Sequence, residues 1–152
     1  MRLSHRLCVL LLVVGLVAVP ASAEGFFRSA GLRFTLSWGG PILIGAEATT
    51  DLGFGLGRAS FFLSPKGEGM FLIGVGIPLT EGEADTITYL EALTGFYYFD
   101  LSAFAPSLLV GLGISYESIT LSPFLLGLAV DFVYPIALPV PLLSTFFGWS
   151  FE

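Results

Sequence analysis

The alternation of large apolar residues with small or polar ones is clearest over residues 107–134. Every second residue from Leu108 to Tyr116 is bulky and apolar, and a second such series runs from Phe124 to Tyr134. The residues between them are mostly small or charged, with Leu109 as the exception in the first series. A period of two is that of a β-strand, whose successive side chains point to opposite faces. Two neighbouring stripes of this length are typical of strands that face lipid.

The same alternation recurs along the rest of the chain, separated by turn-forming residues. Within residues 86–93, the Glu91-Ala92-Leu93 segment also has helical preference. A short helix is the alternative there, although Leu90 and Ala92 alternate with Tyr89 and Glu91 and favour a strand. The predicted strands are Leu32–Trp38, Ile42–Thr50, Arg58–Leu63, Met70–Ile77, Thr86–Phe99, Ser107–Glu117, Phe124–Tyr134 and Pro141–Phe151.

Eight such segments predict an all-β fold, a transmembrane antiparallel up-and-down β-barrel. A strand of about ten residues, rising ~3.3 Å each and tilted ~45°, spans about 23 Å, close to the ~25 Å apolar band of such barrels. A helical membrane protein is the alternative, because Leu101–Ile114 and Phe124–Leu143 are apolar enough for helices. Three prolines interrupt the second window, and no Lys or Arg after Lys66 could orient later helices. The period of two favours the barrel.

The first 23 residues have the features of an export signal. Two arginines precede the apolar run Leu7–Val19, and Ala21-Ser22-Ala23 is a small-residue cleavage site. An uncleaved anchor is the alternative, but the run is shorter than the ~20 residues of a spanning helix. We expect residues 1–23 to be a signal peptide and residues 24–152 to form one outer-membrane β-barrel domain.

Composition narrows the function. The chain is 55% hydrophobic and only 12% charged, whereas about a quarter of residues are charged in soluble domains. After the predicted signal, the chain contains four basic and twelve acidic residues. This excess of negative charge argues against nucleic acid as a partner. Cys8 and His5, the only cysteine and histidine, both lie in the signal. Cysteine or histidine catalysis, disulfides and thiolate metal sites are therefore not expected, and we predict a non-enzymatic protein without a cofactor or metal.

Charged residues on the predicted strands fall on the inward face. We expect them to pair inside a lumen that an eight-stranded barrel fills with its own side chains. The alternative is a narrow polar pore, for which the many inward glycines leave space. Glu117 belongs to the same face near a rim, and the first choice of partner for Arg58 is Glu47, with Glu91 second. The predicted lumen charge cluster is Arg33, Glu47, Arg58, Glu91 and Asp131.

Four aromatic residues fall at predicted strand ends. They are Trp38, Tyr116, Tyr134 and Trp149. Tyrosine and tryptophan gather where a barrel wall crosses the membrane interface. We predict that these four are interfacial aromatics.

The export signal, the eight alternating segments and the aromatic C-terminal strand resemble the outer-membrane protein A and X type of barrel. The resemblance covers Gly31–Glu152 and is architectural, without a diagnostic motif. It implies the outer membrane of a diderm bacterium as location, and the lipid bilayer and the barrel-assembly machinery as partners. Members of the family typically end on a phenylalanine that this machinery reads, whereas here Phe151 is followed by Glu152.

The sequence therefore predicts a non-enzymatic integral outer-membrane β-barrel with a structural or interaction role. One alternative is a narrow pore or transport path for small solutes. Another is a periplasmic soluble lipid-binding barrel, in which the apolar stripes would face inward and the charges would face water.

Overall fold

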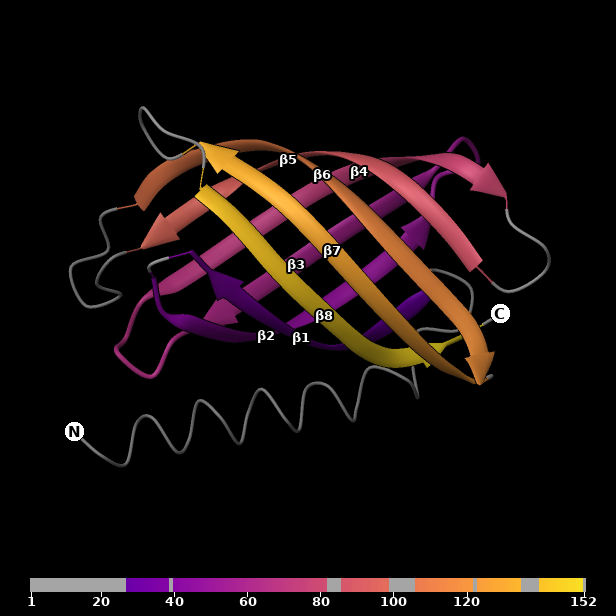
Figure 1. Ribbon diagram of the computed structural model, residues 1–152, viewed down its shortest axis with the longest axis horizontal. Coiled ribbons are helices and arrows are strands. Elements are labelled where there is room, and N and C mark those ends of the chain that lie inside the picture. Colours follow the sequence, from indigo (N-terminus) through magenta and orange to yellow (C-terminus); the bar gives the residue numbers. More distant parts are fainter. Residues whose placement is uncertain are drawn as a thin grey trace.

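A computed structural model of the chain describes residues 27–38, 40–81, 86–98, 106–121, 123–134 and 140–151. These residues form eight β-strands (Figure 1). Within the described ranges, no helix is long and apolar enough to cross a membrane. The strands are β1 (Ser29–Ser37), β2 (Ile42–Asp51), β3 (Leu56–Leu63), β4 (Gly69–Glu81), β5 (Thr86–Tyr98), β6 (Pro106–Leu121), β7 (Phe124–Tyr134) and β8 (Val140–Ser150).

The strands form one closed, antiparallel, up-and-down barrel. Each strand pairs with the next along the chain, and β1 closes the sheet against β8. Ser29, for example, lies opposite Thr49 on one side and Ser150 on the other. The strands run obliquely to the long axis of the barrel (Figure 1). Closure leaves no edge strand with unpaired backbone groups. The predicted all-β, antiparallel up-and-down barrel of eight strands is confirmed, and the helical alternative is wrong.

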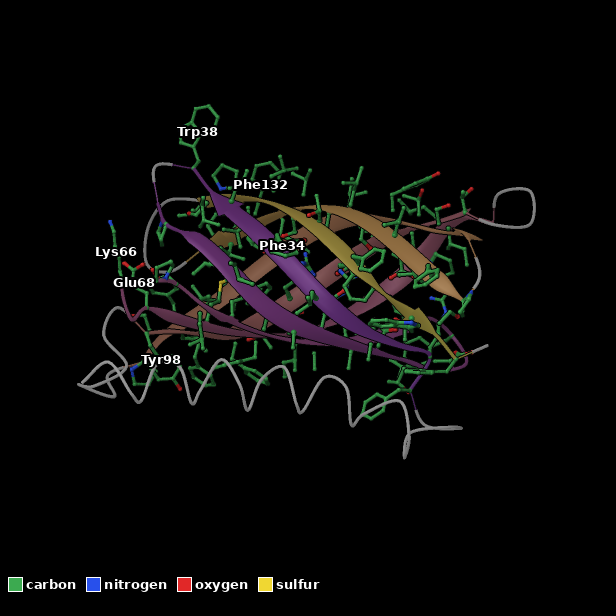
Figure 2. The ribbon with its side chains drawn as sticks, turned by 90° about the horizontal axis from the view of Figure 1, so that it is seen from below. Phe34, Trp38, Lys66, Glu68, Tyr98 and Phe132 are labelled. Atoms are coloured by element: carbon green, nitrogen blue, oxygen red, sulfur yellow. The ribbon has the colours of Figure 1, made fainter. Side chains whose placement is uncertain are left out.

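The up-and-down topology gives the barrel two distinguishable ends. The terminal end is where β1 begins and β8 ends, together with the turn at residues 52–55. The mouth end is where β1 ends and β8 begins, together with the turn at residues 64–68. Figure 2 shows Trp38, Lys66 and Glu68 together at the mouth end.

Large apolar side chains cover the outside of the barrel, as the alternation predicts. In β7, exposed and buried residues alternate without interruption from Phe124 to Tyr134. Leu112 and Leu128 are 60% and 55% exposed, whereas Leu125 and Asp131 are at most 1% exposed. The inward and outward faces are therefore those that the period of two predicts.

The largest differences from the predicted strand boundaries are at the ends of β4 and β6. β6 continues to Leu121 through a register shift between Ser118 and Leu121, whereas the predicted strand ends at Glu117. β4 extends to Glu81 through a second shift after Pro78, whereas the predicted strand ends at Ile77. Residues 86–98 form a strand, so the helical alternative for this segment is wrong. The predicted signal at 1–23 and the connection at 135–139 lie outside the described residues.

Candidate functional site

A cluster of buried charges occupies the barrel interior from the terminal end to its middle. The five residues predicted to form it all point inward and are at most 7% exposed. Two further residues, Arg28 and Glu117, join them at 8% and 3% exposure. Arg28 stands just before β1, and the other members come, in chain order, from β1, β2, β3, β5, β6 and β7. The lumen cluster is therefore Arg28, Arg33, Glu47, Arg58, Glu91, Glu117 and Asp131.

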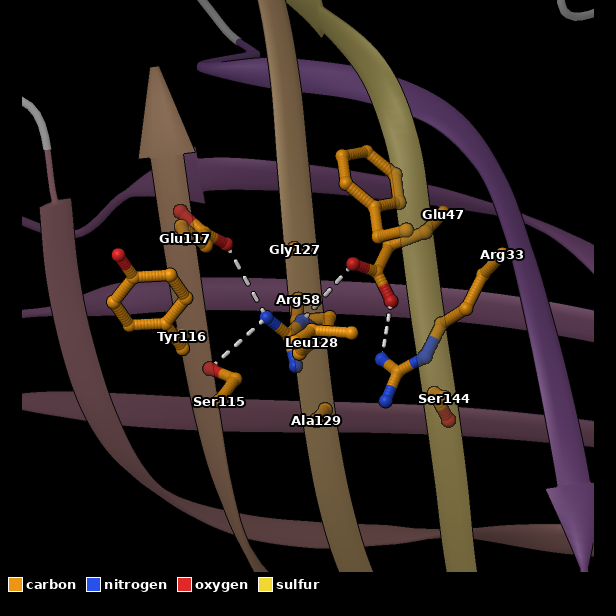
Figure 3. Close-up of a pocket in the computed structure, with 11 residues that line it drawn as sticks. Arg33, Glu47, Arg58, Ser115, Tyr116, Glu117, Gly127, Leu128, Ala129 and Ser144 are labelled. Atoms are coloured by element: carbon orange, nitrogen blue, oxygen red, sulfur yellow. Dashed lines mark hydrogen bonds and ion pairs between the residues drawn. The ribbon is translucent and has the colours of Figure 1, made fainter. Parts of the chain in front are cut away.

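Arg58 lies at the centre of the lumen cluster. Its Nη1 donates to Glu91 Oε2 at 2.6 Å, and its Nη2 lies 3.3 Å from Glu117 Oε1. Its Nε is 3.3 Å from Glu47 Oε1, an ion pair without hydrogen-bond geometry. Figure 3 shows Arg58 between Glu117 and Ser115 on one side and Glu47 on the other. One planar guanidinium with five donors thus contacts three carboxylates.

Arg33 holds the other side of the same network. Its Nη1 donates to Glu47, and its Nη2 donates to Asp131 Oδ2 at 2.7 Å. Glu47 therefore bridges two arginines, and it also accepts a hydrogen bond from Ser60 Oγ at 2.8 Å. The guanidinium of Arg33 lies 5.9 Å from the centre of the Phe62 ring, within the range of a cation–π contact.

Arg28 is the member of the cluster that the sequence prediction missed. Its Nη1 donates to the Tyr89 hydroxyl at 2.7 Å and to Glu117 Oε2 at 3.0 Å. It stands one residue before β1, in a segment whose own alternation is too short to assign a face. The sequence did contain an indication of a further buried cation. The inward carboxylates outnumber the inward arginines, and buried carboxylates need cations as partners. Glu117, predicted near a rim, is instead enclosed between Arg28 and Arg58.

Both predicted partners of Arg58 are in contact with it, but the second choice, Glu91, is the closer one. Glu91 makes the shorter ion pair, and Glu47 is held mainly by Arg33. Glu47 is one strand away from Arg58 in the sheet, whereas Glu91 is two strands away on the other side. Proximity in the sheet therefore did not decide the pairing, because all these side chains meet inside the barrel.

The lumen cluster is packed with little free space around it. The cavity left beside Arg33, Glu47 and Arg58 has a volume of about 10 Å³, room for about one water molecule. One carboxylate oxygen, Asp131 Oδ1, is buried without a hydrogen-bond partner, and it lies close to Gly113.

A second, apolar layer fills the interior toward the mouth end. Leu109, the exception to the alternation in its segment, belongs to this layer and is 2% exposed. An inward leucine would be unexpected if the whole inner face were polar. Here the half of the inner face toward the mouth end is apolar, so Leu109 fits. The apolar layer comprises Leu43, Phe62, Met70, Leu72, Leu109, Val133 and Leu142.

The inward glycines allow strand backbones to approach closely. A Cβ on Gly45 would lie 1.9 Å from the Phe61 carbonyl oxygen, and one on Gly95 would lie 1.9 Å from that of Phe71. No side chain fits at such distances, so these two positions need glycine for the strands to bend and pack. The prediction that inward glycines leave room for a pore is wrong at Gly45.

Three of the four predicted interfacial aromatics lie at strand ends. Trp38 follows β1 and is 85% exposed, Tyr134 ends β7, and Trp149 is the next-to-last residue of β8. Tyr116 does not fit this description, because β6 continues for five residues beyond it and it lies opposite Leu128 in the strand interior. The interfacial role of the other three stays a prediction.

The chemistry open to the lumen cluster is that of ion pairing. Each of its four carboxylates contacts an arginine. Over the described part of the chain, no group of three or more His, Cys, Asp or Glu side chains is arranged to hold a metal ion.

The fold is shared with a solved structure, while sequence comparisons find nothing. No family model matches the chain, and no curated protein matches it. The solution NMR structure of TMB2.3, a de novo designed transmembrane β-barrel, superposes with a TM-score of 0.60 and 13% identity. The match covers 85% of this chain and 98% of the designed one. At this identity the likeness shows the fold.

Proposed function

We propose that the protein is a non-enzymatic integral β-barrel of the outer membrane, with a sealed lumen and a structural or interaction role. The observation that carries the proposal is the inversion of polarity across the wall. Leucine, isoleucine, valine and phenylalanine side chains cover the outside, while seven charged side chains are enclosed. A water-soluble protein of this size ordinarily does the reverse.

The dimensions of the wall agree with a bilayer. β7 has eleven residues, which at ~3.3 Å each and ~45° tilt cover roughly 25 Å, the height of the apolar band of such barrels. Every backbone group of a closed barrel has a partner within the sheet, which is the condition for spanning hydrocarbon. The predicted export signal and the resemblance to outer-membrane protein A and X barrels support the outer membrane as location.

The polarity inversion also argues against the soluble lipid-binding alternative. That alternative requires the apolar stripes to face inward and the charges to face water. The outward position of Leu128 and the enclosed position of Arg58 are the opposite arrangement.

The sealed lumen argues against the pore alternative. Both layers block the path: the lumen cluster leaves about 10 Å³, and the apolar layer follows it toward the mouth end. Opening the polar layer would separate ions that are buried together, which is unfavourable because each charge would lose its partner in a low-dielectric interior.

Conductance in planar bilayers tests the proposal. Folded protein, identified by a heat-dependent shift in gel mobility, is reconstituted and recorded under applied voltage. We expect the protein to enter the bilayer without producing discrete current steps. Reproducible steps would establish a pore and overturn the sealed lumen, and protein that stays in the aqueous phase when mixed with lipid vesicles would overturn the membrane assignment.

A further inference from the structure

A second, larger cavity opens at the mouth end of the barrel. Its volume is about 460 Å³, within the ~300–1,000 Å³ range of small-ligand pockets, which occur in the mouths of β-barrels. This mouth pocket is separate from the water-sized cavity in the lumen cluster and shares no lining residue with it. It is lined by Ser37, Trp38, Gly40, Pro41, Leu43, Lys66, Glu68, Met70, Tyr97, Leu109, Val133, Val140 and Leu142.

The floor of the mouth pocket is the outer surface of the apolar layer. Five of the lining residues belong to that layer, and each is at most 3% exposed. Tyr97 and Val140 pack against the same layer from the side. The apolar layer and the lumen cluster fill the barrel beneath the pocket. The pocket is therefore closed at its floor, and it can hold a ligand but does not lead through the barrel. An alkyl chain is the ligand group that such a floor accommodates best, since it requires no hydrogen bonds.

The rim of the mouth pocket carries one cation that is not used elsewhere. Among the basic side chains that the structure describes, the three arginines form ion pairs inside the barrel, and Lys66 forms none. Lys66 is exposed in the turn between β3 and β4 and lines the pocket (Figure 2). Its ammonium group offers three donors and no acceptor, so it selects an anionic partner.

The acid on the same rim is engaged within the fold. Glu68 accepts a hydrogen bond from Ser64 Oγ at 3.0 Å and also interacts with the Tyr97 hydroxyl. Ser64 Oγ in turn accepts from the backbone N–H groups of Lys66 and Glu68. This network fixes the turn and leaves the Lys66 ammonium as the group available to a ligand.

We propose that the mouth pocket binds a single-chain amphiphile with an anionic head, such as a fatty acid, with its alkyl chain on the apolar floor and its carboxylate at Lys66. The proposal goes beyond a structural or interaction role and rests on the pocket rather than on the location of the barrel. A failure to bind would therefore leave the sealed membrane barrel intact.

A single methyl group reports on the floor of the mouth pocket. The chain contains two methionines, Met1 in the predicted signal and Met70 on the floor. Protein labelled with ¹³C-methyl methionine in lipid nanodiscs is titrated with decanoate, and the Met70 signal is assigned by its loss in Met70→Leu. Because Met70 points inward, alkyl chains dissolved in the surrounding lipid do not reach it. We expect a saturable shift with decanoate and none with acetate, which has the same head and no chain.

Two rim variants test the role of charge. Lys66→Gln should weaken decanoate binding by about two- to fivefold, the size of one exposed ion pair. Glu68→Gln removes the opposite charge from the same turn and should not weaken it. Decyltrimethylammonium, with the same chain and a cationic head, should bind less tightly than decanoate to the unmodified protein.

The outcomes that overturn the proposal are equally specific. Absence of a saturable Met70 shift with decanoate would show that the pocket does not take alkyl chains. Equal binding of decanoate to the unmodified protein and Lys66→Gln, or preferential binding of the cationic amphiphile, would show that the head group is not read by Lys66. Both rim variants change exposed or partly exposed residues of a turn, and the gel-mobility shift confirms that each is folded.

Discussion

At the scale of single residues, the lumen cluster shows which charges depend on a single partner. Glu47 contacts both Arg33 and Arg58, and Glu117 contacts both Arg28 and Arg58. Among the arginines that the structure describes, Arg58 alone pairs with Glu91, which also accepts a hydrogen bond from the Ser115 hydroxyl. Loss of Arg58 therefore leaves Glu91 without a cation, while the other two carboxylates each keep one.

We predict that Arg58→Ala destabilises the barrel by about 3–5 kcal/mol, because it leaves a buried carboxylate uncompensated. Replacing Glu91 with leucine in the same chain should restore part of the loss, since no unpaired charge then remains. The measurement is a double-mutant cycle from urea unfolding in lipid vesicles. The coupling energy should be larger for Arg58 with Glu91 than for Arg58 with Glu47. A cost below about 0.5 kcal/mol for Arg58→Ala, typical of a surface position, would contradict the enclosed geometry.

The inward position of these charges follows from the sequence, while their pairing does not. Alternation along one strand determines the face of Arg33 or Asp131. Which ions meet depends on how all strands are staggered around the closed barrel, and that stagger is a property of eight pairings together. Arg28 could not be placed by alternation, because its segment enters the barrel just before the first regular strand residue.

At the scale of elements, inward glycines fall into two physical classes. Gly45 in β2 faces the backbone of β3, with 1.9 Å between its hypothetical Cβ and the Phe61 oxygen. Gly127 in β7 has its nearest atoms at 3.4 Å, an ordinary contact. The first glycine sets the path of its strand, and the second does not.

Alanine at these two glycines gives a matched comparison. Gly45→Ala should destabilise the barrel by about 1–3 kcal/mol, since the backbone of β3 must move. Gly127→Ala should be neutral or stabilising by up to ~1 kcal/mol, because alanine loses less conformational entropy than glycine in a strand. Urea unfolding of both variants measures the difference. Equal effects would show that the close approach of β2 and β3 at Gly45 is not required.

The outward face of β7 supplies a second test at this scale. Leu128→Arg, near the middle of the strand, should destabilise the barrel by about 2–4 kcal/mol, because a charge is placed in hydrocarbon. Tyr134→Arg, on the same face at the strand end, should cost only ~0–1 kcal/mol, because the side chain reaches the interface. Unfolding free energies in vesicles provide the comparison. Similar costs at the two positions would mean that depth in the membrane does not matter for this face.

The presence of the eight strands could be predicted better than the residues at which the strands end. The eight alternating segments gave the fold because the period of two holds in each of them. The extensions of β4 and β6 include register shifts at Pro78 and after Ser118, where the alternation changes phase. Local phase cannot distinguish a bulge within a strand from the end of a strand. The misplacement of Tyr116 at a strand end follows directly from that ambiguity.

At the scale of the whole molecule, the barrel has an apolar wall outside and a two-layered interior. The polar layer extends from the terminal end to the middle, and the apolar layer occupies the mouth half. The alternation along the sequence does not reveal these two layers. An inward leucine such as Leu109 looks like a break in the alternation, although it belongs to the apolar layer. The polar layer contains the cavity of about 10 Å³, and the apolar layer forms the floor of the mouth pocket.

The claim on which the account depends is that the outward apolar face contacts lipid. Nitroxide labels at Leu128→Cys, in the middle of β7, and at Asp51→Cys, exposed at the end of β2, test it directly by power-saturation electron paramagnetic resonance in nanodiscs. Cys8, in the predicted signal, is replaced by serine if it is retained. We predict that oxygen, which concentrates in acyl chains, relaxes the label at 128 while a water-soluble nickel complex does not. The nickel complex should instead relax the label at 51. Equal relaxation of both labels by the nickel complex would place the apolar face in water and contradict a membrane barrel.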